Sequence, residues 1–200
     1  LGEYRGVGLG SKVILERPAA TIKVGKGLLG RVINGLGDPI DGNGYLEASE
    51  EVSIYAGRTN PLDREPIHQP LDLGVRAING FVSVGMGQRV GIMAGSGVGK
   101  SVLLGMMAKY TNADVNVIAL IGERGREVKE FIERELGPEG LAKSVIIVAT
   151  SDESALVRTR GAFAAMTIAE YFSSLGLNVL FMMDSVTRFA MAQREVGLAA

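Results

Sequence analysis

Cysteine is absent from the sequence, so the chain can form neither a disulfide nor a thiolate metal site, which fits a cytosolic protein. The formal net charge is only −1, which argues against a surface dominated by nucleic-acid binding. No apolar run approaches the roughly 18 residues of a membrane-spanning helix, and no signal peptide is recognisable. Hydrophobic residues nevertheless make up 46% of the chain, which supports a sizeable buried core.

The length of 200 residues suits one large domain or one and a half small ones. The chain begins at Leu1 rather than Met and stops without a closing signal, so we expect an excerpt from a longer protein. Glycine accounts for 28 residues, about twice the usual share of roughly 7%, and frequent turns are therefore expected.

Two regions of different pattern divide the chain. Residues 1–57 combine glycine with short β-type runs, and residues 35–44 cluster turn dipeptides, which predicts strands and tight turns. Residues 58–72 carry three of the six prolines and are predicted to be a surface connection. From residue 73 onward, buried strands are predicted to alternate with helices.

The alternating region has four apolar runs that predict buried strands, at 88–93, 115–122, 144–150 and 178–184. Helical patterns follow them, at 100–111, 126–136, 150–172 and 185–195. The first helix is apolar nearly all round and should be buried, the second should end at Gly137–Pro138, and residues 150–153 resemble a capping box. This order predicts an α/β fold with a parallel sheet and helices on both faces.

The stretch "GIMAGSGVGKSVLL", residues 91–104, fits the phosphate-loop pattern G-x-x-x-x-G-K-[ST] except that Ala94 replaces the first glycine. Such a loop directs backbone N–H groups at phosphate oxygens, which requires small residues with permissive dihedrals. Lys100 would bring a positive charge to the β- and γ-phosphates, Ser101 would offer Mg²⁺ an oxygen, and the helix N-terminus would add its dipole. The residues predicted to bind the nucleotide are Gly95, Ser96, Gly97, Val98, Gly99, Lys100, Ser101 and Val102.

Acidic residues end two of the predicted strands. Asp184 follows "NVLFMM" and could hold Mg²⁺ through its water shell or cap the next helix. Glu123 ends the strand after the loop helix and could polarise a water for attack on the γ-phosphate. Because ligands of parallel sheets sit outside the carboxyl ends of the strands, Glu123, Asp184 and the loop should open onto one edge.

Three arginines lie near these acids in the sequence. Arg124 and Arg126 could stabilise phosphate charge, and Glu123 and Arg126 could instead belong to a solvated charge cluster that starts a helix. Arg188 lies within a turn of Asp184 and could contact the catalytic carboxylates or phosphate, or form a structural ion pair.

Several stretches together resemble the flagellar protein-export ATPase: "GLLGRVINGLGDPIDGNG", "PLDREPI", "GVRAINGF", "AGSGVGKS", "LIGERGREVKEFIE" and "MMDSVTRFAMAQRE". Type III secretion ATPases are very similar, and both groups belong to the rotary ATPase superfamily with the catalytic subunits of ATP synthase. The resemblance covers essentially the whole chain. It implies a RecA-like P-loop core, with residues 1–24 as the end of a small N-terminal β-barrel and residues 25–200 as most of the nucleotide-binding domain.

The resemblance also implies roles for individual residues of an ATPase that uses ATP and Mg²⁺. Lys100 and Ser101 match the family's loop lysine and serine, Glu123 its catalytic glutamate, Arg124 its phosphate arginine and Asp184 its metal-site aspartate. We therefore expect Glu123, Lys100, Arg124 and Arg188 to act in catalysis and Ser101 and Asp184 to hold the metal. Alanine at the first loop position is familiar in this branch, so Ala94 marks a subfamily and not a broken site.

The family works as a homohexamer with nucleotide between subunits and an arginine donated by the neighbour. That arginine, the adenine pocket and a C-terminal helical domain are expected beyond residue 200. The implied function is ATP hydrolysis that energises the export of flagellar proteins, in the cytoplasm and peripherally at the inner face of the bacterial cytoplasmic membrane. The implied partners are export chaperone–substrate complexes, a stalk protein, a negative regulator and the membrane export gate, with no specific nucleic acid.

Other functions remain open at this point. The chain could serve a virulence type III secretion system, the injectisome. It could be an ATP-synthase-type catalytic subunit, although "RGREV" and "MAQRE" weigh against that assignment. It could be a RecA-like nucleic-acid translocase, or a non-catalytic nucleotide-binding scaffold, against which Glu123 speaks.

Overall fold

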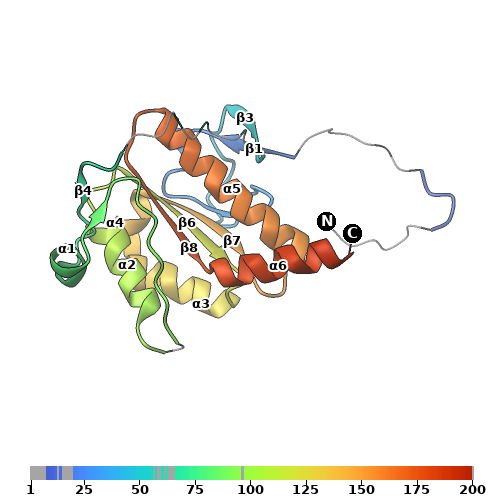
Figure 1. Cartoon of the computed structure of the whole chain (residues 1–200). Coiled ribbons are helices and arrows are strands. Elements are labelled where there is room, and N and C mark those ends of the chain that lie inside the picture. Colours follow the sequence, from blue (N-terminus) through green and yellow to red (C-terminus); the bar gives the residue numbers. More distant parts are fainter. Residues whose placement is uncertain are drawn as a thin grey trace.

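The computed structural model describes residues 8–12, 14, 20–55, 57, 60, 62, 66–95 and 97–199. Its centre is a four-stranded, all-parallel sheet with the strand order β2-β7-β6-β8 (Figure 1). The four strands are β2 (Val32–Asn34), β6 (Val115–Ile121), β7 (Ser144–Ala149) and β8 (Val179–Asp184). Every residue of β6 and β7 is buried, which explains why their sequences are apolar except for Asn116 and Ser144.

Helices cover both faces of the sheet (Figure 1). One face carries α5 (Ala155–Ser174), on which α6 (Val186–Ala199) packs. The other carries α2 (Lys100–Tyr110), α3 (Gly125–Glu130), the π-helical segment η3 (Phe131–Leu136) and α4 (Gly137–Ala142). Alternate residues of β6 separate the two cores, because Val117 packs with the α5 face and Ile118 with the α2 face.

Shorter elements surround this framework. They are β1 (Thr21–Val24), a 3₁₀ turn η1 (Lys26–Leu28), β3 (Glu50–Ser53), β4 (Pro70–Leu71), α1 (Arg76–Phe81) and β5 (Val84–Gly85). Strand β1 pairs antiparallel with β3, and β4 pairs antiparallel with β5. Most of residues 1–19 lie outside the described residues, so the β-barrel assignment and the boundary at residue 24 stay predictions.

The segment 35–46 closes the outer edge of β2. Ile33 forms an antiparallel bridge with Pro39, and the Ile40 N–H donates to the Val32 carbonyl at 2.9 Å. The Arg31 guanidinium holds the following turn through two hydrogen bonds to the Asp41 carboxylate, at 2.7 and 2.9 Å. This ion pair and the N–H bonds that Asp41 accepts hold the pKa of that carboxyl well below its usual range.

The strand predicted at 88–93 is wrong. No strand is formed there, Val90 is exposed, and the Met93 side chain is 96% exposed. An apolar composition favours a strand only where a neighbour supplies hydrogen bonds, and this segment does not pair with β8, which ends the sheet and pairs with β6 alone among the described strands. This segment has no strand partner among the described residues.

Three helix predictions also need correction. The face of α2 formed by Val102, Met106 and Tyr110 is exposed, so this helix is buried on one side only. The helix expected at 126–136 becomes π-helical from residue 131, and α4 follows directly where it was expected to stop. The cap of α5 is Ser154, whose hydroxyl accepts from the Val157 N–H at 3.3 Å, and not the predicted 150–153 box.

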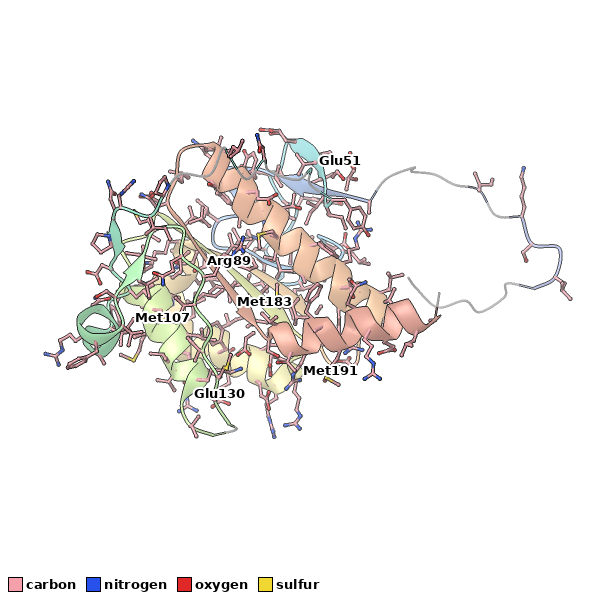
Figure 2. The ribbon with its side chains drawn as sticks, viewed as in Figure 1. Glu51, Arg89, Met107, Glu130, Met183 and Met191 are labelled. Atoms are coloured by element: carbon pink, nitrogen blue, oxygen red, sulfur yellow. The ribbon has the colours of Figure 1, made fainter. Side chains whose placement is uncertain are left out.

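Side-chain positions follow the two-core arrangement (Figure 2). Met107 and Met183 lie among the packed elements, whereas Glu130 and Met191 project from the surface of the fold. Close backbone packing joins α2 to η3, because a Cβ added at Gly105 would lie 2.8 Å from the Glu135 carbonyl oxygen. Among the described helices, none combines the length and the apolar character that a membrane span requires.

Candidate active site

The phosphate-loop region leads directly into α2, which begins at Lys100. Gly97 and Gly99 have φ angles of +75° and +91°, in the left-handed region that favours glycine. A Cβ placed on Gly95, Gly97 or Gly99 would meet nothing within 4 Å, so the loop backbone is open to a close-approaching ligand. Ser96 lies outside the described residues. The loop thus ends at a helix N-terminus, whose unpaired N–H groups favour anions.

Two acidic residues lie beside this helix start at the carboxyl edge of the sheet. Strands β6 and β8 are neighbours, and Leu120 pairs in register with Asp184. The Lys100 ammonium forms an ion pair with the buried Asp184 carboxylate. Glu123 follows β6 by two residues, so both acids lie at the edge where parallel sheets present their ligands.

A cavity of about 240 Å³ connects these groups. Its lining residues are Ser101, Leu120, Glu123, Glu127, Val128, Glu130, Phe131, Glu135 and Asp184. The structure therefore brings four predicted site residues together: the loop lysine and serine, the glutamate after β6 and the aspartate of β8. The side chains of Val98 and Val102 are exposed and are not among the lining residues, so only their backbone could serve the site.

The electrostatics single out Glu123. Burial raises the pKa of the Glu123 carboxyl to about 7, aided by its hydrogen bond with Glu127 and the charge of Asp184, while Arg188 and Lys100 act in the opposite direction. The same hydrogen bond lowers the pKa of the Glu127 carboxyl. With a pKa of about 7, the Glu123 carboxyl can gain or lose a proton near neutral pH, as a general base must.

Arg188 reaches the site from the first turn of α6. Its Nη1 donates to the Gly122 carbonyl, and its Nη2 lies 3.5 Å from Oε2 of Glu123. The aliphatic stem crosses Gly122, where an added Cβ would lie 2.7 Å from the Arg188 Cδ. A glycine at position 122, with φ +74°, is therefore part of the seat for this arginine.

None of the three arginines is among the residues that line the cavity. Arg124 pairs with Glu127, with Nη1 and Oε1 3.1 Å apart, and its side chain is 69% exposed. Arg126 is exposed and has no ion pair with any residue in the described part of the chain. Of the three arginines considered from the sequence, only Arg188 contacts Glu123.

The sequence analysis missed Glu127 and Gly122. Glu127 lies four residues after Glu123, in the first turn of α3, and this spacing could have indicated a second carboxyl group at the same helix start. The described residues contain no group of three or more histidine, aspartate or glutamate side chains arranged to hold a metal ion. The oxygens of Ser101 and Asp184 fit Mg²⁺, which commonly takes only one or two protein ligands beside phosphates and water.

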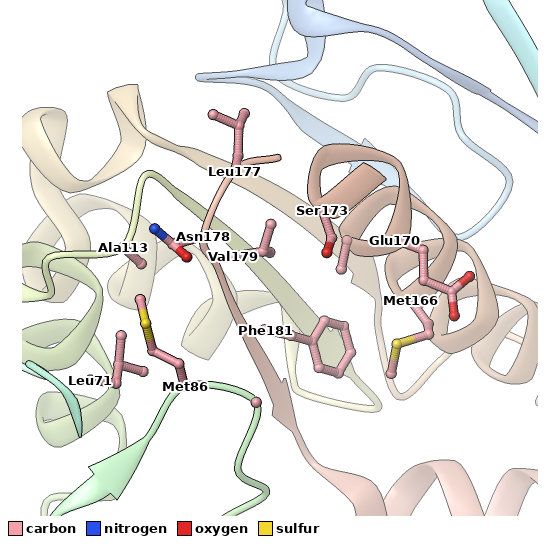
Figure 3. A pocket seen from close by; sticks show the side chains of 12 residues that line it. Leu71, Met86, Ala113, Met166, Glu170, Ser173, Leu177, Asn178, Val179 and Phe181 are labelled. Carbon is pink, nitrogen blue, oxygen red and sulfur yellow. The ribbon is translucent and has the colours of Figure 1, made fainter. Parts of the chain in front are cut away.

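A second cavity, of about 320 Å³, lies elsewhere on β8 (Figure 3). Val179 and Phe181 of β8, Met166 and Glu170 of α5, and Met86 line it. It reaches Val179, the first residue of the strand, whereas the carboxylates described above lie at the opposite end. This cavity is therefore separate from the candidate active site.

Comparison with known proteins agrees with this architecture. Residues 74–200 match the ATP synthase alpha/beta family, nucleotide-binding domain. The flagellum-specific ATP synthase of Bacillus subtilis (strain 168) is 54% identical over 198 residues, which cover 99% of this chain and 45% of that protein. The type 3 secretion system ATPase of Xanthomonas euvesicatoria is 54% identical over 200 residues, which cover 100% of this chain and 45% of that protein. The chain thus spans about 45% of the length of these relatives.

Solved structures show the same fold. A prototypical ATPase from the type III secretion system of pathogenic bacteria matches with a TM-score of 0.87 and 55% identity, covering 90% of this chain and 52% of that one. The assembled ATPase EscN in complex with its central stalk EscO, from enteropathogenic E. coli, matches with a TM-score of 0.85 and 55% identity. The match covers 90% of this chain and 44% of that one. The α/β core with a parallel sheet and flanking helices predicted from the sequence is confirmed. Because more than half of the chain matches, the chain belongs to the ATP synthase alpha/beta family, and residues 74–200 to its nucleotide-binding domain.

Proposed function

We propose that the chain carries the ATP-binding and catalytic core of an ATPase that energises protein export through a flagellar type III secretion apparatus. One observation carries the proposal: Lys100 and Ser101, at the start of α2, lie with Glu123 and Asp184 at the same edge of the sheet. A phosphate-binding loop, a metal carboxylate and a buried base are the parts that ATP hydrolysis requires.

The loop binds the phosphates of ATP. Backbone N–H groups of residues 95–102 surround them, and the Lys100 ammonium exchanges its partner Asp184 for the β- and γ-phosphate oxygens. Ser101 and Asp184 would hold Mg²⁺, which when bound neutralises charge on the β- and γ-phosphates. The dipole of α2 adds a further favourable contribution for the anion.

Glu123 acts as the general base. Its carboxylate takes a proton from a water while the water oxygen forms a bond to the γ-phosphorus, and the bond to the bridging oxygen of ADP breaks. The side chain of Glu123 is only 14% exposed, and partial burial is what keeps its basicity high. Arg188 lies close enough to stabilise charge on the γ-phosphoryl group, whereas Arg124 would have to leave Glu127 to do so.

Export is supported by the relatives. The matched proteins include flagellum-specific ATP synthases and a type 3 secretion system ATPase, and EscN is described as an assembled ATPase with a central stalk. We infer a homohexamer that binds a stalk protein and works in the cytoplasm, peripherally at the inner face of the bacterial cytoplasmic membrane. The remaining proposed partners are the chaperone–substrate complexes, a negative regulator and the membrane export gate.

The hydrolysis proposal is tested by substitution in the full-length protein. Glu123→Gln keeps the shape of the side chain but removes the base, so turnover should fall by about 10²–10⁴ while ATP still binds. The control is Glu133→Gln, the same change in η3 at an exposed residue that pairs with Lys129, at 3.7 Å. Near-wild-type turnover of Glu123→Gln would show that Glu123 is not the base.

The loop assignment has its own test. Lys100→Ala removes the main counter-charge of the phosphates, and binding of a fluorescent ATP analogue should be abolished. Unchanged affinity would show that the loop does not bind the nucleotide.

A second function, ATP hydrolysis for a virulence secretion system, is favoured by the equal identity of 54% to the Xanthomonas euvesicatoria protein. Deleting the gene distinguishes the two. Loss of secreted flagellar axial proteins supports the first proposal, and loss of host-directed effector secretion with intact motility supports the second.

A further inference from the structure

Two opposite-charge pairs hold the four charged groups at the carboxyl edge of the sheet. Lys100 pairs with Asp184, and Arg188 pairs with Glu123. Lys100 and Arg188 are thus each engaged by a carboxylate with another proposed task, metal binding for Asp184 and base catalysis for Glu123. Binding of a nucleoside triphosphate must therefore exchange partners within both pairs.

The two pairs respond to different parts of the nucleotide. A lysine at the end of a phosphate loop reaches the β- as well as the γ-phosphate, so a diphosphate already suffices to open the Lys100–Asp184 pair. A water activated by Glu123 must lie within hydrogen-bond reach of its carboxylate, and the γ-phosphorus lies roughly 3–3.5 Å beyond that water. Arg188, with its Nη2 3.5 Å from the Glu123 carboxylate, therefore lies on the side of the site where the γ-phosphate would bind.

We propose that Arg188 is a specificity-determining residue that holds Glu123 until a γ-phosphate is present, and then moves to that phosphate and frees Glu123 to activate water. This inference rests on the proposed ATPase function. It makes the base available with a nucleoside triphosphate and keeps it engaged with a diphosphate.

The local structure allows this exchange. The Arg188 side chain is 39% exposed, so its head group is held from one side and can turn toward the cavity. Its stem is seated over Gly122, and its own N–H is fixed by the Ser185 carbonyl at 3.1 Å in the first turn of α6. A rotation of the side chain that gives up the Nη1 hydrogen bond to the Gly122 carbonyl would carry the guanidinium toward the phosphate. A carboxylate and a terminal phosphate compete for one guanidinium, and the phosphate, with more charge, is the stronger partner.

The test is equilibrium binding of Mg-ADP and of a non-hydrolysable Mg-ATP analogue to the full-length protein. Glu123→Gln removes the carboxylate that competes for Arg188, so the ATP analogue should bind about tenfold more tightly, which corresponds to roughly 1.4 kcal/mol. ADP affinity should change by less than about twofold, because no γ-phosphate is present to accept the arginine.

The double variant separates partner exchange from simple charge removal. In an Arg188→Ala background, Glu123→Gln should no longer tighten binding of the ATP analogue, because the cation for which the two groups compete is gone. Tightening that persists in this background would mean that loss of one negative charge explains the effect, and the proposal would be overturned. Equal tightening of ADP and the analogue, or no tightening of either, would overturn it as well.

Two further variants complete the experiment. Glu133→Gln removes an exposed carboxylate outside the cavity, which pairs with Lys129 at 3.7 Å, and it should leave the ratio of the two affinities unchanged. Arg188→Gln keeps part of the stem over Gly122 and replaces Arg188→Ala if circular dichroism shows the alanine variant to be misfolded. Failure of the ATPase proposal itself is distinguishable, since Lys100→Ala would then leave both affinities intact.

Discussion

The raised pKa of Glu123 makes the pH dependence of hydrolysis the sharpest quantitative expectation. A general base must be deprotonated to act, and burial raises the pKa of this carboxyl to about 7. The active fraction should be roughly one tenth at pH 6 and about nine tenths at pH 8, so kcat/KM should rise about tenfold over that interval. The value of kcat/KM rises with pH because the protonated form of Glu123 is the inactive one.

Glu127→Gln tests the cause of this pH dependence. Its hydrogen bond with Glu123 helps to raise the pKa of the Glu123 carboxyl, so the substitution should move the acidic limb of kcat/KM to lower pH. Burial remains, so the limb should stay above the range of an exposed glutamate. The terminal phosphate of ATP titrates nearby, but wild type and variant share that substrate, and their difference reports the protein. A profile that is flat between pH 6 and 8, or that moves upward in the variant, refutes this reasoning.

Further expectations concern the loop, the arginine seat and the β2 edge. Ala94→Gly should be nearly silent in a steady-state ATPase assay, and a loss above roughly tenfold (~1.4 kcal/mol of barrier) would contradict our reading of that position. Gly122→Ala places a Cβ 2.7 Å from the Arg188 Cδ at a residue whose φ is +74°, so ATPase activity should fall at least about tenfold. A fully active variant would show that the aliphatic stem of Arg188 can shift at no cost. Asp41→Asn weakens the two charge-assisted hydrogen bonds from Arg31 and should lower the free energy of unfolding by about 2 kcal/mol in denaturant titrations. An unchanged unfolding midpoint would show that this ion pair does not stabilise the fold.

The central strands were predictable because burial on both faces leaves a continuous apolar run. Strands β6, β7 and β8 fall within one residue of their predicted limits. The shorter run at 88–93 was predicted on the same grounds, yet a strand also needs a partner, and sequence alone does not reveal which neighbour supplies the hydrogen bonds. The addition of β2 to the sheet likewise depends on pairing with β7, more than 100 residues away in the chain.

The candidate site was predictable where chemistry fixes the residue type and topology fixes the place. Lys100, Ser101, Glu123 and Asp184 meet because strand ends and a loop share one edge. Side-chain direction is a different matter. Arg124 is adjacent to Glu123 in sequence but pairs with Glu127, since the start of α3 turns it outward. Such orientations depend on helix geometry that residue spacing does not specify.

The backbone contact at Gly105 has a mechanical consequence. The backbone of Glu135 in η3 lies directly against α2 at Gly105, and no side chain that could change its conformation separates the two backbones. Packed interiors of this kind transmit displacement instead of absorbing it. The helix that begins at Lys100 and the segment that continues from α3 would therefore tilt as one stiff body. The gap between the phosphate loop and the sheet edge would then open or close by motion of this pair against the strands, and not by bending within either helix.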